Sequence, residues 1–465
     1  MSKQSAQPLL VSAPAGAGLP QYYQQPPAYQ TFVVPVRIEV QPVQYRRSPL
    51  RRFLCAFFLA TALWVTLKTL LIHHYHHGRH DWDWPIPSDM VLGECVTGSA
   101  WGTSAVALTG DSSPNASFEI PLDVDTVLLL SSYRKSSFST HSLSGTLDIT
   151  TSSNLSDSAN IIVHSFDGMR TDKNLKACLM TGEDGRIGVG IFRKGFWWDT
   201  SATFMKISLV LPATTTLAQV EALKVNLPNF SIHVGNLKDS VDFQSVSLKT
   251  TNAAVEVNSL SAARVLLQTS NARINADSLV STDLAIKTSN SPITGTYNTS
   301  DSLHITTSNA PINVAVGLAN NDKTKPTVLV MTTSNNRLDA KVTLSTKAHK
   351  GGNYSVLGRT SNGPLAISIP GSPIASALNL NARTSNAAAE VKLHGAYQGT
   401  FGVSTSLRAS ANVTRLDKSG DDSRHIDFDS NRRGEVRGSV YEKESGKELG
   451  EVRVRTSNAP VVLFV

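Results

Sequence analysis

The chain has 465 residues, with 43 Lys and Arg against 36 Asp and Glu, so its formal net charge is +7 at pH 7 and its sequence pI is about 9.2. Residues 1–52 hold six of the basic residues and one Glu, a net of +5, and Lys68 adds one more, which leaves +1 for everything else. A nucleic-acid partner requires clustered Lys and Arg in the folded part, so we set that class aside.

Residues 1–52 are rich in Pro, Gln, Ala and Tyr and show no sustained hydrophobic period, which predicts a disordered tail. The tail contains Pro26-Pro27-Ala28-Tyr29, a PPxY sequence. Such segments bind aromatic grooves because their extended conformation is already formed, and WW domains of ubiquitin ligases that act on membrane proteins read PPxY. The alternative is a chance match in a tail of this composition.

Residues 53–72 form a run of twenty with a single charge, which is long enough to cross a bilayer as a helix. Four Arg precede this run and only Arg79 follows it closely, so the positive-inside rule places the N-terminus in the cytoplasm. We therefore predict a single-pass type II membrane protein whose C-terminal part is extracellular or lumenal. The six Asn-x-Ser/Thr sequons all lie beyond the helix and are candidates for N-glycosylation: Asn115, Asn154, Asn229, Asn298, Asn353 and Asn412.

Residues 73–88 form a juxtamembrane linker rich in His and Trp. A dedicated metal site needs fixed geometry and supporting hydrogen bonds that such a linker rarely supplies, so we expect neither a metal nor a cofactor. Beyond the linker, Cys95 and Cys178 are the only two cysteines. In an oxidising compartment they form one even pair and a candidate disulfide, with two buried free thiols as the alternative.

Residues 89–242 are predicted to be a β-rich N-terminal cap with irregular coils. The expected strands cover 118–130, 146–150, 160–164, 176–181, 186–192, 206–211 and 230–234.

Residues 243–465 repeat a phrase close to Thr-Ser-Asn, followed by a small residue and an alternating apolar stretch. Its Asn positions are Asn252, Asn271, Asn290, Asn309, Asn335, Asn362, Asn386 and Asn458. Apolar or small residues recur three and five positions after each Asn, with mostly polar residues between them, which is the period of a half-buried strand. Asn tolerates the backbone angles of a tight bend, and Asn stacked on Asn can hydrogen-bond along the column. The pattern predicts an all-β fold, a parallel β-solenoid or β-helix with coils of 19–27 residues.

Two features depart from the regular repeat. Extra residues at 320–325 and 347–352 lengthen two coils, and a pair of cationic loops there would suit acidic glycans, with inert solvated loops as the alternative. Residues 434–454 read as a hairpin that caps the C-terminal end.

The repeat phrase, in its Ser-Asn-Ala-Pro and Ser-Asn-Gly-Pro variants, resembles the "putative adhesin" family of β-solenoid proteins over residues 240–465, and more loosely before them. The tail, single anchor and ectodomain together look like fungal membrane proteins. The resemblance implies a solenoid fold and a surface location, and it carries no catalytic residues.

We therefore expect a non-catalytic, membrane-anchored surface or lumenal protein whose rigid solenoid serves adhesion, wall contact or scaffolding, with cell-wall glycans or surface proteins as partners. The outward columns stack no acids in adjacent coils, so no catalytic residues are predicted. The alternatives are a carbohydrate-active enzyme on the same fold and a PPxY-bearing trafficking adaptor for a WW-domain ubiquitin ligase.

Overall fold

The computed structural model describes residues 86–101, 115–133, 143–165, 175–193, 203–213, 217–321, 324–406, 408–416 and 424–465. The predicted tail with Pro26, Pro27 and Tyr29, the predicted helix at 53–72 and the His tract lie outside these ranges. Among the described residues, no helix has the length and apolar character needed to cross a membrane.

The described chain is all-β, with no α-helix in these ranges. The strands before the repeats are β1 (Met90–Thr97), β2 (Asn115–Pro121), β3 (Thr126–Tyr133), β4 (Leu143–Ser152), β5 (Ser158–Ser165), β6 (Leu175–Gly182), β7 (Arg186–Arg193), β8 (Thr203–Pro212), β9 (Ala218–Asn226), β10 (Phe230–Asn236) and β11 (Val241–Lys249). The predicted strand at 118–130 is two strands, β2 and β3, because Pro121 ends the first one and residues 122–125 bend. Strand β9 was not predicted.

The repeats supply β12 (Val255–Gln268), β13 (Ile274–Lys287), β14 (Ile293–Thr306), β15 (Ile312–Ala319), β16 (Thr327–Thr332), β17 (Leu338–Ser345), β18 (Asn353–Arg359), β19 (Leu365–Gly371), β20 (Ala377–Arg383) and β21 (Ala389–Lys392). The C-terminal part contains β22 (Gly399–Ser404), β23 (Ala411–Thr414), β24 (His425–Arg432), β25 (Glu435–Tyr441), β26 (Glu451–Arg455) and β27 (Val461–Phe464). Two short 3-10 helices, η1 (Gly98–Ala100) and η2 (Glu444–Glu448), complete the elements.

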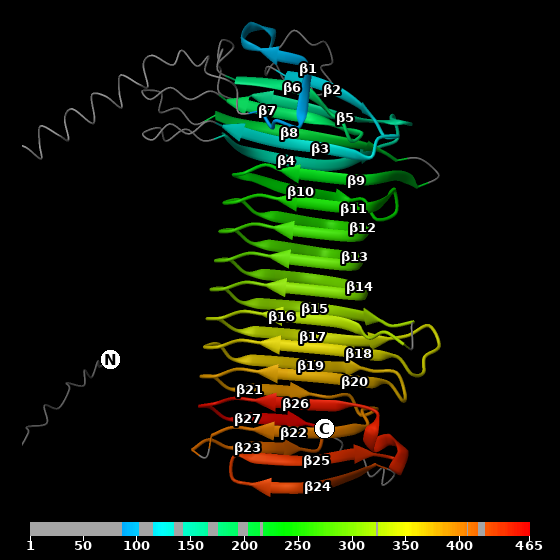
Figure 1. Cartoon of the computed structure of the whole chain (residues 1–465), viewed down its shortest axis with the longest axis vertical. Helices are drawn as coiled ribbons and strands as arrows, with labels where there is room; N and C mark the ends of the chain where they lie inside the picture. Colours follow the sequence, from blue (N-terminus) through cyan, green and yellow to red (C-terminus); the bar gives the residue numbers. More distant parts are fainter. Residues whose placement is uncertain are drawn as a thin grey trace, which may run out of the picture. The chain divides into compact units, whose positions relative to one another are not determined.

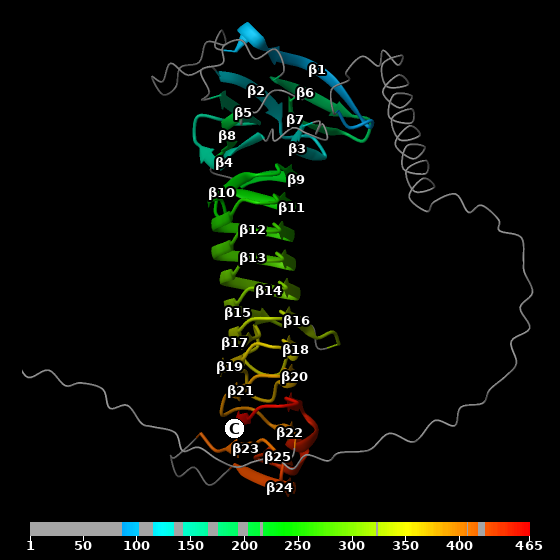
Figure 2. The ribbon, with the colours of Figure 1, turned by 90° about the vertical axis from the view of Figure 1, so that its left-hand side faces the viewer.

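The strands form one long, mostly parallel sheet that runs as two stacks (Figures 1 and 2). Stack A is the pairing series β2, β5, β8, β4, β10, the first halves of β12, β13 and β14, then β15, β17, β19, β21, β27 and β23. Stack B is the series β1, β6, β7, β3, β9, β11, the second halves of β12, β13 and β14, then β16, β18, β20, β26, β22, β25 and β24. Antiparallel pairs occur only near the two ends of this described series.

The core lies between the stacks, as the period-two alternation requires. Val255, Ile274 and Ile293 stand in register in neighbouring strands, and all three are fully buried. The buried Tyr297 and Tyr354 also lie in this interior, where their hydroxyls donate to the backbone oxygens of Thr294 and Ser345 at 2.6 and 2.5 Å. The hydroxyls of these two tyrosines are therefore both satisfied.

The repeat phrase forms the corner between the second strand of one repeat and the first strand of the next. At every step the Nδ2 atom of one Asn donates to the Oδ1 atom of the preceding Asn, at 2.6 to 2.8 Å. This ladder starts one Asn before the first repeat phrase, at Asn229, which lies 23 residues before Asn252 and has a left-handed φ of 65°. The Asn side chains therefore link successive layers along one exposed edge.

The Thr of each phrase is buried beneath this corner. From the second phrase on, its hydroxyl donates to a backbone oxygen of the preceding corner, as from Thr333 to Ala310 and from Thr384 to Gly363, at 3.0 and 3.1 Å, whereas the buried hydroxyl of Thr250 has no such bond among the described residues. A hydroxyl can satisfy a corner carbonyl that the strand ladders do not reach, which explains Thr at a buried position.

The C-terminal segments stack in an order that differs from their order in the chain. Strands β26 and β27, which belong to the last repeat, pair with β20 and β21, while β22 and β23 lie on their far side. The predicted hairpin at 434–454 is wrong. The hairpin is β24–β25, turning at Gly434 with a φ of 82°, and residues 444–448 form η2 instead of a turn between strands.

Candidate ligand-binding face

Three arginines stand side by side on the outer surface of stack B. Arg359 pairs in register with Arg383, and Arg383 pairs with Arg455. All three side chains are exposed, and none forms an ion pair with the residues that the structure describes. Because neighbouring strands are about 4.8 Å apart, the side chains leave the sheet at this regular spacing. The result is a short row of uncompensated guanidinium groups, which we call the arginine row.

From Lys249 to Ser404, the arginine row belongs to a longer column that carries no acid, and the next layer places Glu435 beside Ser404. The column runs through Lys249, Gln268, Lys287, Thr306, Thr332, Arg359, Arg383, Arg455 and Ser404 in successive layers. Two positions back along four of these strands, Leu266, Ala285, Val330 and Leu357 make a partly exposed apolar stripe beside it, which His304 interrupts between Ala285 and Val330. A face with a cationic column and a flanking apolar stripe suits a linear anionic ligand that lies along the stack.

The outer surface of stack A has a different charge pattern. Its carboxylates are held by neighbouring cations: Glu256 pairs with Arg273, Asp339 with Arg337, and Glu390 with Lys392. Hydrogen bonding from Arg273 lowers the pKa of Glu256 below its usual range, and His233 lies 3.1 Å from the same carboxylate. The register places Glu256 beside Asn275 and Asp339 beside Ala366, so acids do not stack there.

A hollow of about 280 Å³ opens at the C-terminal end of the arginine row. Gly402 forms its floor, since a Cβ added to Gly402 would meet no atom within 4 Å. Arg453 and Arg437 stand in register on either side of Gly402. The remaining charged groups of the lining are Arg455, Asp429, Glu435 and Glu451.

Two of the arginines in this hollow are paired within their own strands. The side chain of Arg453 donates to Glu451 at 2.5 Å, and Arg437 forms an ion pair with Glu435. Arg455, by contrast, has no such partner in the described part of the chain. Beside these two compensated pairs the hollow has one further cation, Arg455, and one further carboxylate, Asp429, and it joins the arginine row at Arg455.

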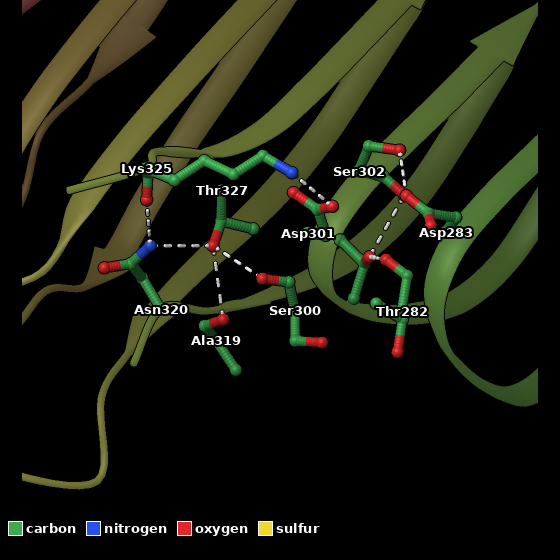
Figure 3. A network of polar contacts seen from close by, with 10 residues as sticks. Thr282, Asp283, Ser300, Asp301, Ser302, Ala319, Asn320, Lys325 and Thr327 are labelled. Atoms are coloured by element: carbon green, nitrogen blue, oxygen red, sulfur yellow. Dashed lines mark hydrogen bonds and ion pairs between the residues drawn. The ribbon is translucent and has the colours of Figure 1, made fainter. Parts of the chain in front are cut away.

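The two predicted cationic loops lie at the opposite corner from the Asn ladder, between β15 and β16 and between β17 and β18. Figure 3 shows the root of the first loop, where Nζ of Lys325 lies 2.6 Å from Oδ2 of Asp301 and Nδ2 of Asn320 donates to the Lys325 carbonyl at 2.9 Å. In the second loop, the backbone N–H of Lys347 donates to Oδ1 of Asn321 at 3.1 Å. The charge of Lys325 is thus compensated locally, which makes this loop a weaker anion site than the arginine row.

The six sequons occupy different surroundings. Asn154 lies exposed in the turn after β4, Asn412 lies exposed in β23, and Asn115, Asn298 and Asn353 are half-buried. Asn229 begins the amide ladder, and its Nδ2 atom donates to the Leu143 carbonyl at 3.4 Å. A glycan on Nδ2 of Asn229 would have to replace that contact, so Asn154 and Asn412 are the most accessible of the six.

The two cysteines are joined. Cys95 in β1 and Cys178 in β6 are register partners in an antiparallel pair, and a disulfide links them across 83 residues of sequence. The bond attaches β1 to the rest of stack B, beside a small apolar cluster that contains Met90, Met180 and Phe192.

No three His, Cys, Asp or Glu side chains are arranged to hold a metal ion within the described ranges. The arginine row was not predicted from the sequence. Arg455 lies 72 positions after Arg383, and only the stacking of the last repeat on β20 brings them together. A signal was present, because each of the three stands immediately before the Thr of a repeat phrase.

Comparison with known proteins adds little to this description. No protein-family model matches the chain, and no curated protein matches it. Among solved structures, the chain is similar to a "putative cell adhesion protein" from Clostridium sporogenes at 9% identity, covering 76% of this chain and 99% of that chain with a TM-score of 0.16. The proposals below therefore rest on the residues of this chain.

Proposed function

We propose that the repeats wind as a parallel β-solenoid, carried outside the cytoplasm on a single-pass anchor, and that this solenoid serves adhesion, wall contact or scaffolding without catalysis. Support for the winding comes from the register between successive repeats and from the continuous Asn ladder. Support for the location comes from the sequence at 53–72 and from the exposed sequons.

The ligand class that best fits the surface is an acidic polysaccharide. The observation that carries this proposal is the register of Arg359, Arg383 and Arg455, which presents three uncompensated guanidinium groups in adjacent layers. Guanidinium groups bind carboxylates and sulfates through two parallel hydrogen bonds, and a row of them favours a chain with regularly spaced anions.

The test measures binding of the purified full-length chain to a polyuronic acid, with a neutral glucan as the reference ligand. Arg383→Gln is expected to weaken binding about tenfold, since losing one charge-assisted contact costs about 1.4 kcal/mol. Arg383→Lys keeps the charge and loses the pair of parallel hydrogen bonds. Its affinity for the polyuronic acid should therefore lie between those of the native chain and Arg383→Gln. Lys341→Gln removes one exposed charge from the outer surface of stack A and serves as the matched control.

Two results would remove this proposal. One is equal binding of the polyuronic acid by the native chain and by Arg383→Gln. The other is an equal loss in Arg383→Gln and Lys341→Gln, which would indicate attraction by net charge instead of recognition by the arginine row.

One observation favours a second candidate, a carbohydrate-active enzyme. The hollow at Gly402 brings together three carboxylates, from Asp429, Glu435 and Glu451, and a pair of carboxylates is what glycoside hydrolysis requires. Time-dependent release of reducing ends from the polyuronic acid, abolished by Glu435→Gln, would establish it. The trafficking role of Pro26, Pro27 and Tyr29 is a separate proposal, which unchanged abundance and localisation of Tyr29→Ala would remove.

A further inference from the structure

Each stack ends in an edge strand at the C-terminal end of the described series. In stack B the last strand is β24, whose Asp427, Asp429 and Arg432 place charges along the edge. In stack A the last strand is β23, with the sequence Ala-Asn-Val-Thr and no charge. Among the described residues, β23 pairs with β27 alone. Charged side chains on an edge strand oppose the addition of another strand. Strand β24 has such charged residues, whereas β23 has none.

The short strand β23 instead carries a complete sequon, Asn412-Val413-Thr414. Asn412 and Thr414 are exposed, while Ala411 and Val413 are partly buried against the core. The alternation therefore directs the Asn412 amide to the outer surface of stack A, on its last described layer. A group attached there would stand beside the edge of β23 that has no strand partner among the described residues.

The other end of stack A also carries a sequon, but its edge strand includes the exposed Glu119 and Pro121, which oppose strand addition more than β23 does. Strand β2 is the first of the series, pairs with β5 alone among the described strands, and begins with the sequon residue Asn115. The two ends of the stack are different surfaces, so pairing between the β23 edge of one copy and the β2 edge of another would be head-to-tail. Head-to-tail contacts form closed rings where the rotation between copies closes, and they continue into filaments where it does not.

We propose that Asn412 is N-glycosylated and that its glycan blocks the β23 edge against addition of a second copy of this chain. The inference rests on the lumenal or extracellular location in the proposed function. In the transfer, the Asn412 amide nitrogen loses a proton and bonds to the first sugar of an oligosaccharide, and the lipid diphosphate that carried the oligosaccharide leaves.

The experiment expresses the full-length chain in a glycosylating eukaryotic host and compares Thr414→Ala with Thr414→Ser. The first change destroys the sequon and keeps Asn412, whereas the second retains the sequon. Glycan occupancy is read by mass spectrometry, and self-association by size-exclusion chromatography with light scattering in detergent. We expect an occupied Asn412 and a monomer for the native chain and Thr414→Ser, and a shift to dimers and larger species for Thr414→Ala.

Enzymatic removal of glycans from the native, folded chain provides a second measurement in case Thr414→Ala fails to fold, and it should produce the same shift. An unoccupied Asn412, or an unchanged monomer after deglycosylation, would overturn the inference. Glycan occupancy of Asn154, which lies in a turn, separates a failure of the edge inference from a failure of the proposed lumenal or extracellular location. If Asn154 is glycosylated and Asn412 is not, the edge inference fails alone, and if no sequon is occupied, the proposed location fails with it.

Discussion

The Nδ2 atom of Asn458 donates to the Oδ1 atom of Asn386 at 2.7 Å, although 72 residues separate the two in the chain. Every other bond of the ladder joins residues 19 to 27 positions apart. The last repeat therefore inserts between β20–β21 and β22–β23, so the end of the chain becomes an internal layer of both stacks. An internal layer gains backbone pairing on both sides, which a terminal strand does not have.

The ladder should contribute measurably to stability. In Asn309→Ala two side-chain bonds are lost, one to Asn290 at 2.7 Å and one from Asn335 at 2.8 Å. We expect the free energy of unfolding to fall by about 1–2 kcal/mol, measured as a lower midpoint in urea. Asn258→Ala, an exposed Asn outside the ladder, is the control and should change little. Equal midpoints for the two variants would mean that the ladder bonds are no stronger than bonds to water.

Much of this fold could be predicted from the sequence because the determinants are local. The alternation after each Asn identifies the inward residues Val255, Ile274 and Ile293, and the structure buries all three. The stacking order at the C-terminal end was not predictable in the same way. Two similar segments could occupy the layer after Asn386: the phrase at Thr456 and the related Thr405-Ser406. In the structure Thr456 donates to Ala387 in that layer, and the Thr405 hydroxyl donates to Ala459 at 2.8 Å in the following one. The local difference is the third residue, because Thr456-Ser457 is followed by Asn458, which bonds to Asn386 in the ladder, whereas Thr405-Ser406 is followed by Leu407.

The candidate binding face depends on that same choice. The outward positions of Arg359 and Arg383 follow from strand alternation, but their extension by Arg455 follows from the insertion of the last repeat. The hollow at Gly402 likewise requires β22 to lie between β25 and β26. Both features arise between segments that are distant in the chain, and only the arginine row has a local signal, since each of its members precedes the Thr of a repeat phrase.

The buried Thr of the phrase should matter through its hydroxyl. Thr333 is 1% exposed, and its Oγ1 donates to the Ala310 carbonyl at 3.0 Å. Thr333→Val keeps the shape and removes the donor, which leaves a buried carbonyl without this partner and should cost about 1–3 kcal/mol. Thr333→Ser retains the donor and should cost less, the loss of one methyl group being about 1 kcal/mol. A lower urea midpoint for Thr333→Val than for Thr333→Ser would support the hydrogen bond. The reverse order would indicate that packing of the methyl group dominates.

Alkaline pH should destabilise the stacks through the buried tyrosines. Burial raises the pKa of Tyr354 to about 12, from an ordinary value of 10.0. A raised pKa means that the folded state holds the proton more tightly, so this contribution is fully present below pH 10 and is lost progressively as the pH rises towards 12. In Tyr354→Phe this part of the pH dependence should disappear, which thermal melts between these pH values would measure. An unchanged alkaline slope in Tyr354→Phe would assign the effect to other groups, among them Tyr297, whose pKa burial also raises.

The disulfide should stabilise the N-terminal end without affecting the distant repeats. It closes 83 residues of chain and attaches β1 to β6, and closing a loop of this length contributes about 4 kcal/mol in the chain-entropy account. In a stack whose layers contact mainly their neighbours, this stabilisation remains local. The double variant Cys95→Ser, Cys178→Ser is therefore expected to speed hydrogen exchange in β1 and β6 while the amides of β13 to β19 exchange as before. Unchanged exchange in β1 would show that strand pairing alone holds it, and faster exchange throughout the repeats would show that the stacks unfold as one cooperative unit.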